Sequence, residues 1–327
     1  MKDRIMSGIL GLCVGDAIGV PAEFINRESL KPSPVTDMRG HGTHNQPPGT
    51  WSDDTSMALC TMDSLSNGLD YADMMRRFLS WMEKGEYTPH GEMFDIGIST
   101  RKALQRFAMG TEPLKCGGAS ENDNGNGSLM RILPLIFYLK SLYGDHFTEN
   151  NEAFDIIHNI SSLTHAHKRS QIACGIYLSV ANELSGSNHS VGYGVWKACK
   201  HYGSRSEFAE ELIHFQRIFS DDYGKLSFAN QSQDEIRSSG YVVDTLEAAI
   251  WCLLNSDSYE SCVLKAVNLG DDTDTVAAVA GGLAGLRYGV DAIPEKWLSQ
   301  IFHLDYIKGL CEAYNLALQR IRIKTIT

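Results

Sequence analysis

Two short clusters of aspartate and hydroxyl residues are the part of the sequence best suited to chemistry. The first, Ser52–Thr55, reads Ser-Asp-Asp-Thr, and the second, Asp271–Thr275, reads Asp-Asp-Thr-Asp-Thr. Taken alone, each cluster can be explained as a helix start, because the helix dipole and unpaired backbone N–H groups stabilise acids there. The pattern of each cluster therefore leaves open whether it does more than cap a helix.

The segment after the second cluster favours a metal ion. Residues 276–286 are apolar or small on nearly every face, so this helix should be buried and its start, with Asp272 and Asp274, should lie near the interior. Carboxylates are costly there unless something neutralises them. Oxygen ligands favour Mg²⁺, Mn²⁺ or Ca²⁺, whereas zinc would need a Cys/His set that the sequence lacks. Two such clusters predict a joint site for two divalent cations, with two independent helix caps as the alternative.

A glycine-rich turn, Gly125–Ser128, precedes a segment that we expect to be helical from Leu129 to Leu142. Small residues before a helix allow close backbone approach, and the free N–H groups at a helix start bind anions. A simple loop-to-helix turn is an equally good explanation of the pattern. In an acidic protein, backbone donors of this kind are the expected means of holding a diphosphate.

Four other polar residues lie within or beside apolar helical stretches. Glu23 lies seven residues after Asp16, about two helical turns, so both side chains would share one face if the helix continued past Pro21. His165 lies between two predicted helices, and Tyr241 precedes another. A structural salt bridge is the alternative for Asp16, a helix cap for His165 and core packing for Tyr241.

The elements that must position these residues are helices. Apolar residues recur at helical spacing in most of the chain, alternating strand patterns are scarce, and no βαβ rhythm is present. We expect one all-α domain over residues 1–327 with about a dozen helices. The clearest helical segments are Met57–Leu65, Met74–Met82, Leu129–Leu142, Ala153–Leu163, Ile172–Leu184, Val242–Leu254 and Val276–Leu286.

Three long irregular segments separate these helices, at residues 26–51, 110–128 and 219–240. The first two are rich in proline or glycine and end at Ser52–Thr55 and at the Gly125–Ser128 turn. Loops of this length inside a compact domain are usually functional. We therefore expect them to line a site.

The bulk composition describes an acidic globular protein. The chain has 327 residues, 43% of them hydrophobic, and a net charge of −11. This charge argues against general binding to nucleic acids or anionic membranes. The N-terminal residues lack the pattern of a signal peptide. The sequence contains no run of about 18 apolar residues, so we expect no transmembrane helix. The eight cysteines form no Cys-x-x-Cys pair and are expected to be buried thiols of a reducing compartment. We expect a cytoplasmic monomer.

Together these elements resemble the ADP-ribosylglycohydrolase family. The resemblance extends over residues 11–288, and the second cluster departs from the family pattern only at Asp271, where a glycine is common. Two segments, Phe94–Gly97 and Ser239–Ala248, are similar to the bacterial branch that includes the dinitrogenase reductase-activating glycohydrolase. The motifs that carry the resemblance are, in order, Gly15–Gly19 with Glu23, Ser52–Thr55, Gly125–Arg131, Thr164–His165 and Asp272–Thr275.

The resemblance implies an all-α fold with a binuclear Mg²⁺ or Mn²⁺ centre in a cleft. It implies catalytic roles for Glu23, Asp53 and Asp272. The implied metal ligands are Ser52, Asp53, Asp54, Asp272, Asp274 and Thr275. The implied substrate-binding residues are Asp95, which would meet the leaving side chain, and Asn126, Gly127, Ser128, His165 and Tyr241, which would hold or line ADP-ribose.

The expected reaction is hydrolysis of the bond between ADP-ribose and a protein side chain, with ADP-ribose as the product. The match at Asp95 favours arginine as the acceptor. Serine, a nucleic-acid end and O-acetyl-ADP-ribose remain alternatives, and so does a non-enzymatic ADP-ribose-binding protein. A carboxylate, either Glu23 or one of the metal-binding aspartates, would activate the attacking water.

Overall fold

The computed structural model describes residues 1–186, 189–219 and 226–326, and over these residues the chain is helical and contains no β-strand. The all-α fold predicted from the hydrophobic spacing is therefore confirmed. The α-helices are α1 (Lys2–Gly19), α2 (Arg27–Leu30), α3 (Asp53–Leu65), α4 (Tyr71–Lys84), α5 (Ile98–Ala108), α6 (Leu135–Tyr143), α7 (Asn151–Ser162), α8 (Lys168–Ser185), α9 (Val191–Gly203), α10 (Val242–Leu254), α11 (Tyr259–Val267), α12 (Thr273–Tyr288), α13 (Glu295–Leu298) and α14 (Leu304–Ile326). Short 3-10 helices lie at Val20–Ala22, Gly42–His44, Pro113–Lys115, Glu121–Asp123, Gly144–Glu149, Ser206–Phe208, Leu212–Phe215, Ser227–Asn230, Gln233–Glu235 and Val290–Ala292.

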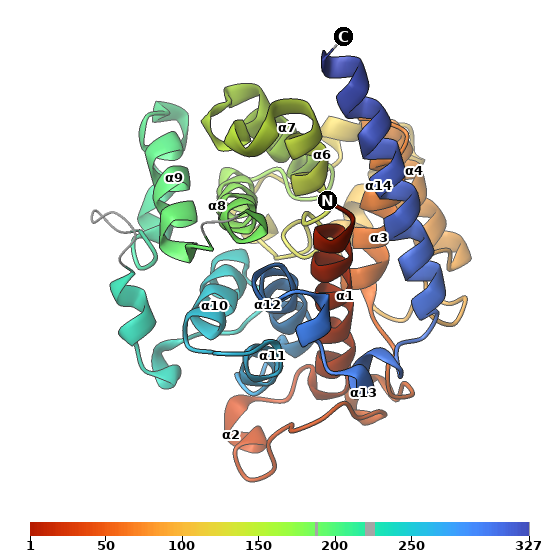
Figure 1. Ribbon diagram of the computed structural model, residues 1–327, viewed down its shortest axis with the longest axis vertical. Coiled ribbons are helices and arrows are strands. Elements are labelled where there is room, and N and C mark those ends of the chain that lie inside the picture. Colours follow the sequence, from red (N-terminus) through yellow and green to blue (C-terminus); the bar gives the residue numbers. More distant parts are fainter. Residues whose placement is uncertain (187–188, 220–225, 327) are drawn as a thin grey trace.

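Helices α1 and α12 lie side by side at the centre of the molecule (Figure 1). Small residues let their backbones touch: a Cβ atom added at Gly15 would lie 2.1 Å from the Ala277 carbonyl oxygen, and one added at Gly281 would lie 2.3 Å from the Gly11 oxygen. The order of these contacts shows that the two helices are antiparallel. The C-terminal end of α1 is therefore held against the N-terminal end of α12.

The other helices surround this pair (Figure 1). Helix α3 packs against α4 and α14 on one side, whereas α10 and α11 pack against α12. Helix α8 packs against α7, α9 and α10. By length and composition, Asp3–Ala22 could cross a membrane, but 94% of its most apolar window is buried inside the fold. All eight cysteines are free, and seven are buried, as expected.

One predicted helix begins later than expected. The segment from Leu129 was predicted to be helical, but α6 starts only at Leu135 and the preceding residues form turns. Pro134, at the N-cap of α6, explains the delay, because proline disfavours helical conformation in the residue before it and cannot donate a helical hydrogen bond. The Gly125–Ser128 turn therefore does not lie at the N-terminus of an α-helix, and the predicted helix start there is wrong. Anion binding by this turn stays a prediction.

Two other expectations concern helix ends. Helix α1 ends at Gly19, and Glu23 follows the 3-10 turn Val20–Ala22 with extended backbone angles, so Asp16 and Glu23 do not share a helix face. Of the loop expected at 219–240, residues 220–225 lie outside the described residues. The helix start considered for the first cluster is confirmed, because the Ser52 side chain caps α3.

Candidate active site

The N-terminus of α3 is held by a carboxylate from α1. Asp16 is fully buried, and its oxygens accept hydrogen bonds from the Ser52 amide at 3.0 Å and from the amide and hydroxyl of Thr55 at 3.0 and 2.6 Å. Burial raises the pKa of Asp16 to about 6. Among the described residues no cation pairs with Asp16, so the salt bridge considered as its alternative is not formed.

The two aspartate clusters meet in the interior. Carboxylate oxygens of Asp16, Asp54 and Asp274 lie within 4.8 Å of one another, and so do those of Glu23, Asp272 and Asp274. The hydroxyl of Thr275 donates to Asp54 Oδ2 at 3.3 Å, which links the clusters directly. The alternative of two independent helix caps is therefore wrong.

The electrostatics of this cluster favour a bound cation. Burial, and after it repulsion from neighbouring carboxylates, raises the pKa values of Asp53, Asp54 and Asp274 well above their usual range. Asp54 Oδ1 and Asp272 Oδ1 are buried and have no hydrogen-bond partner among the residues that the structure describes. Orphaned carboxylate oxygens are costly in an interior, and a divalent cation with oxygen ligands would satisfy them. The residues present therefore fit metal ions.

A cleft of about 400 Å³, the acidic cleft, opens beside this cluster. Eight of the residues predicted for the site line it, and three predicted metal ligands, Ser52, Asp54 and Asp274, lie behind its wall. Its lining residues are Glu23, Phe24, Asp53, Asp95, Ile96, Gly97, Ile98, Ser99, Thr100, Asn122, Gly125, Asn126, Gly127, Met130, His165, Gly240, Asp272 and Thr275.

Two predicted substrate-binding residues do not line the cleft. The Ser128 hydroxyl is buried and accepts a hydrogen bond from Ser161 at 3.0 Å. The hydroxyl of Tyr241 accepts one from Arg169 at 3.1 Å, while its backbone forms a β-bridge with Gly125. Both residues support the cleft wall from behind, so direct contact of either with a ligand stays a prediction.

Asn126 connects the glycine-rich turn to the acidic cluster. Its side-chain amide donates to Asp272 Oδ2 and to the Thr245 hydroxyl, both at 2.9 Å. Its backbone N–H donates to the Gly240 carbonyl at 3.1 Å. These bonds fix one oxygen of Asp272, Oδ2, whereas Oδ1 has no partner in the described part of the chain.

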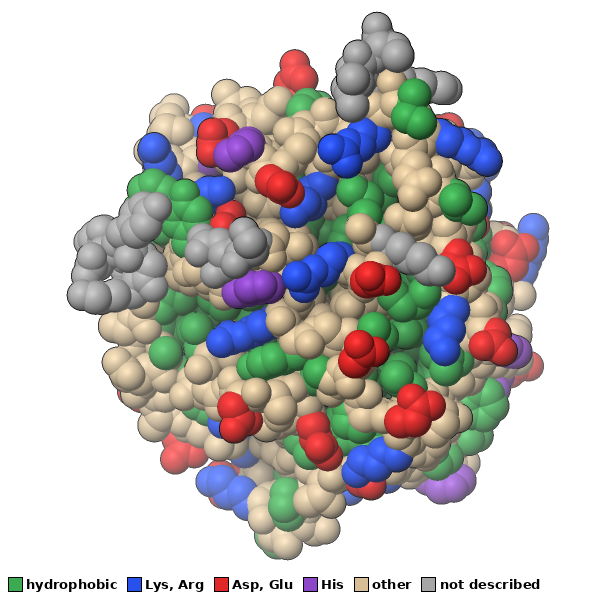
Figure 2. All heavy atoms as spheres, in the orientation of Figure 1, with side chains coloured by type: hydrophobic (Ala, Val, Ile, Leu, Met, Phe, Trp, Pro, Cys, Tyr) green, Lys and Arg blue, Asp and Glu red, His purple; other side chains and the backbone are tan. Residues whose placement is uncertain are grey.

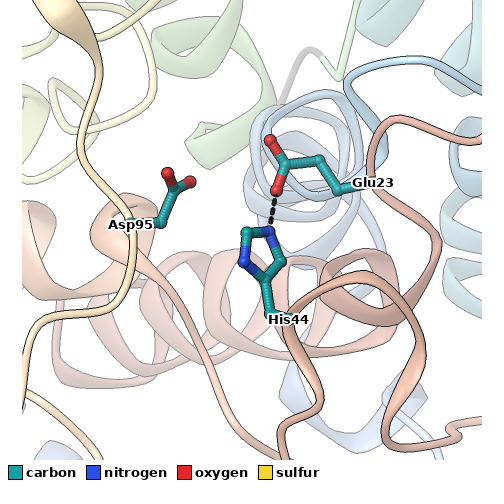
Figure 3. Close-up of side chains that lie close together, drawn as sticks. All are labelled: Glu23, His44 and Asp95. Atoms are coloured by element: carbon teal, nitrogen blue, oxygen red, sulfur yellow. Dashed lines mark hydrogen bonds and ion pairs between the residues drawn. The ribbon is translucent and has the colours of Figure 1, made fainter.

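A second group of side chains lies at the acidic cleft: Glu23, His44 and Asp95, with ligand atoms within 4.8 Å of one another. Figure 3 shows the His44 ring bonded through Nε2 to Glu23, with Asp95 across from both. Burial raises the pKa of Glu23 to about 7, and the bond to Glu23 raises that of His44. The sequence reasoning missed His44, because it lies in the irregular segment 26–51, where no spacing relates it to Glu23.

The sequence profile of the family described as ADP-ribosylglycohydrolase matches residues 1–323. The chain belongs to the ADP-ribosylglycohydrolase family. The resemblance stated from the motifs and the hydrolase class that it implied are thereby confirmed.

Individual relatives agree with the family profile. ADP-ribosylarginine hydrolase Tri1 of Serratia proteamaculans is 35% identical over 320 residues, which cover 95% of this chain and 78% of that protein. ADP-ribosyl-(dinitrogen reductase) glycohydrolase of Rhodospirillum rubrum is 32% identical over 305 residues, which cover 92% of this chain and 91% of that protein. A solved structure titled ADP-ribosylglycohydrolase-related protein complex superposes with a TM-score of 0.74 at 30% identity, covering 98% of both chains.

Asp271, where this ADP-ribosylglycohydrolase departs from the expected glycine, has a structural account. Its backbone has a positive φ of 61°, the conformation that glycine adopts most readily. Its N–H donates to the Ile25 carbonyl at 2.9 Å, and its carbonyl accepts from Phe24 at 2.7 Å. The side chain is exposed, so its carboxylate points to solvent and the backbone of Asp271 holds the turn beside Glu23.

Proposed function

We propose that this protein hydrolyses the bond between ADP-ribose and the guanidinium group of modified arginine side chains, with two Mg²⁺ or Mn²⁺ ions. The observation that carries the proposal is the pairing of a buried aspartate cluster with a cleft that presents Glu23 and Asp95 at the same surface. Two carboxylates suit a cationic leaving group, whereas the neutral O-glycoside of a serine side chain offers them no positive charge. The relatives named as ADP-ribosylarginine hydrolases support the same acceptor.

The aspartate cluster is the proposed metal site. The ligands would be Ser52, Asp53, Asp54, Asp272, Asp274 and Thr275. Bound cations would supply positive charge for the ribose hydroxyls and for a water molecule. Asp16 would orient the first ligand loop without binding metal, because hydrogen bonds from α3 already occupy its two oxygens.

The proposed water-activating base is Glu23. His44 holds one oxygen of this carboxylate, and the other has no hydrogen bond to any described residue (Figure 3). Glu23 would take a proton from water as the water oxygen bonds to the anomeric carbon and the bond from that carbon to the guanidinium nitrogen breaks. Asp95 would face the guanidinium and orient it for departure. Asp53 and Asp272, which line the same cleft, would help to keep the reacting centre in place.

The remaining expectations form part of this proposal. We expect one domain over residues 1–327 that acts as a cytoplasmic monomer, without general binding to nucleic acids or membranes. The net charge of −11 supports the last point, and Figure 2 shows basic side chains interspersed with acidic and hydrophobic ones on the face drawn. A non-enzymatic ADP-ribose binder is disfavoured, because every one of the six ligand positions carries an oxygen donor.

The test is release of ADP-ribose from arginine- and serine-modified proteins in Mg²⁺ and in Mn²⁺. We expect release from arginine, its loss in Asp53→Ala, and a larger drop in kcat/KM for arginine than for serine substrates in Asp95→Asn. Unchanged release by Asp53→Ala would refute the metal site. Equal losses on both substrates in Asp95→Asn would refute its role in acceptor choice.

A further inference from the structure

A buried arginine lies directly behind the acidic cleft. The side chain of Arg131 is fully buried, and its guanidinium carbon lies 4.7 Å from the centre of the Phe78 ring. Its Nη2 donates to the Ile160 carbonyl at 3.1 Å and to the Thr164 hydroxyl at 2.8 Å. Among the described residues no carboxylate pairs with it, and its Nε and Nη1 atoms have no partner. Such a charge is costly to bury, which suggests a role beyond packing.

The hydroxyl of Thr164 joins this arginine to His165, and these three residues are called the relay below. Its Oγ1 lies 2.8 Å from Arg131 Nη2 and 2.9 Å from His165 Nδ1. Burial lowers the pKa of Arg131 to about 10, so the guanidinium stays charged at neutral pH and can only donate. The hydroxyl therefore accepts from Arg131. Its own proton has no acceptor other than His165 Nδ1 among the residues that the structure describes.

The protonation of the imidazole follows from this arrangement. Burial, and then the charge of Arg131, lowers the pKa of His165 to about 3, so the ring is neutral and carries one proton. Because Nδ1 accepts from Thr164, that proton is on Nε2. The opposite tautomer would give Thr164 two donors and leave its hydroxyl proton without an acceptor, which is costly in an interior.

The protonated edge of the ring faces the glycine-rich turn. A Cβ atom at Gly125 would lie 3.4 Å from His165 Nε2, and one at Gly127 would lie 2.8 Å from Cε1. All three residues line the acidic cleft, and Nε2 has no hydrogen-bond partner among the described residues. Glycine at both positions leaves room for a ligand atom to approach this nitrogen.

We propose that Arg131 and Thr164 are positioning residues that fix His165 as the Nε2–H tautomer, so that it donates a hydrogen bond into the cleft to an oxygen of ADP-ribose. The identity of the acceptor rests on the proposed function, whereas the tautomer rests only on the contacts within the chain. A neutral donor suits this place, because it selects an oxygen acceptor without adding a cation that would repel the metal ions.

The first experiment uses no substrate. In protein labelled with ¹⁵N-histidine, correlation of ring protons with ring nitrogens identifies which nitrogen of His165 is protonated, and the spectrum of His165→Gln assigns the signal. We expect protonated Nε2 and unprotonated Nδ1 at neutral pH. A proton on Nδ1, or a doubly protonated ring, would overturn the proposal whatever the protein hydrolyses.

The second experiment separates the hydroxyl from the volume of the side chain. Thr164→Val keeps the shape and removes the hydroxyl, whereas Thr164→Ser keeps the hydroxyl. Titration with ADP-ribose in Mg²⁺ should show about fivefold weaker binding for Thr164→Val and a Kd within about twofold of the original for Thr164→Ser. The Nε2–H signal should be retained in the serine variant and shifted in the valine variant. Equal binding by both variants with an unchanged signal would overturn the relay.

The outcomes keep this proposal apart from the proposed function. If the tautomer is as expected and ADP-ribose binds, but no ADP-ribose is released from modified protein, the proposed function fails and the relay stands. If release occurs and the tautomer is reversed, the relay fails and the proposed function stands.

Discussion

The carboxylate of Asp16 accepts both the amide and the hydroxyl hydrogen bonds of Thr55, at 3.0 and 2.6 Å. It thereby fixes the first turn of α3 to the end of α1, which α12 contacts in turn. The first aspartate cluster is thus placed by a residue that the sequence reasoning singled out but could not assign. Its hydrogen bonds hold the loop of proposed metal ligands in place from within the protein core.

Asp16→Asn should destabilise the protein by about 1–3 kcal/mol, because an amide group cannot accept all of the donors that face this carboxylate. Urea unfolding monitored by circular dichroism would measure the change. Asp3→Asn, on the exposed first turn of the same helix, is the matched control and should shift the unfolding free energy by less than about 0.5 kcal/mol. Unchanged stability with weakened metal binding would instead make Asp16 a ligand.

Asp54→Asn should separate the destabilising effect of the acidic cluster on the fold from its proposed role in binding metal. Without metal, the variant should be at least as stable as the original protein, because one buried negative charge is gone. With Mg²⁺ or Mn²⁺, the original protein should gain about 2.7 kcal/mol at a metal concentration 100 times Kd, and the variant should gain little. Thermal melts in EDTA and in each metal give both numbers. Asp271→Asn, whose carboxylate is exposed, should gain as much as the original, and an equal gain by Asp54→Asn would contradict the site.

Acid should destabilise the protein through a buried histidine, His158 of α7, whose Nε2 lies 2.9 Å from the Tyr202 hydroxyl of α9. Burial, and then the charge of Arg205, lowers the pKa of His158 from 6.5 to about 3, so the unfolded chain binds this proton first as pH falls. The stabilisation is therefore complete above about pH 6.5 and is lost toward pH 3. At pH 5 the loss should be about 2 kcal/mol. Urea unfolding of the original and of His158→Gln between pH 7.5 and 5 should show a shallower slope for the variant, and parallel curves would contradict this assignment.

The glycines between α1 and α12 should tolerate no side chain. Gly15→Ala would place Cβ 2.1 Å from the Ala277 carbonyl oxygen, so the helices would have to separate, at a cost of at least about 2 kcal/mol. Gly309, inside α14, has no atom within 4 Å of its would-be Cβ, and Gly309→Ala should raise stability by up to about 1 kcal/mol. Thermal unfolding of the two variants compares them directly. Equal effects would show that the close contact does not matter.

Helical periodicity predicted most of the fold, because a buried stripe repeats every three to four residues wherever a helix packs on a core. It failed where a backbone rule overrides the pattern. The apolar run from Leu129 continues without a break into α6, yet Pro134 delays the helix to Leu135. That proline was visible in the sequence, and its effect on the preceding residue should have moved the predicted boundary.

The part of the candidate site that could be predicted is the part where the sequence places charged carboxylates at a position that should be buried. Three aspartates before an apolar helix pointed to a cation, and the structure brings one of them, Asp274, within 4.8 Å of Asp54 in the first cluster. His44 was not predictable, because its bond to Glu23 spans an irregular segment without periodicity. The relay through Arg131 was hidden for a related reason, since nothing in a sequence shows that an arginine is buried.

The contact between α1 and α12 also bears on how the molecule is made. Helix α1 is synthesised before α12, which begins more than 250 residues later at Thr273, so the cleft can form only after this length of chain has left the ribosome. Until then, α1 has no partner for its glycine-lined face, and its length and apolar composition match those of a membrane span. During synthesis, the glycine-lined face of α1 is therefore an apolar surface that is available to a chaperone or a membrane-targeting factor until α12 covers it.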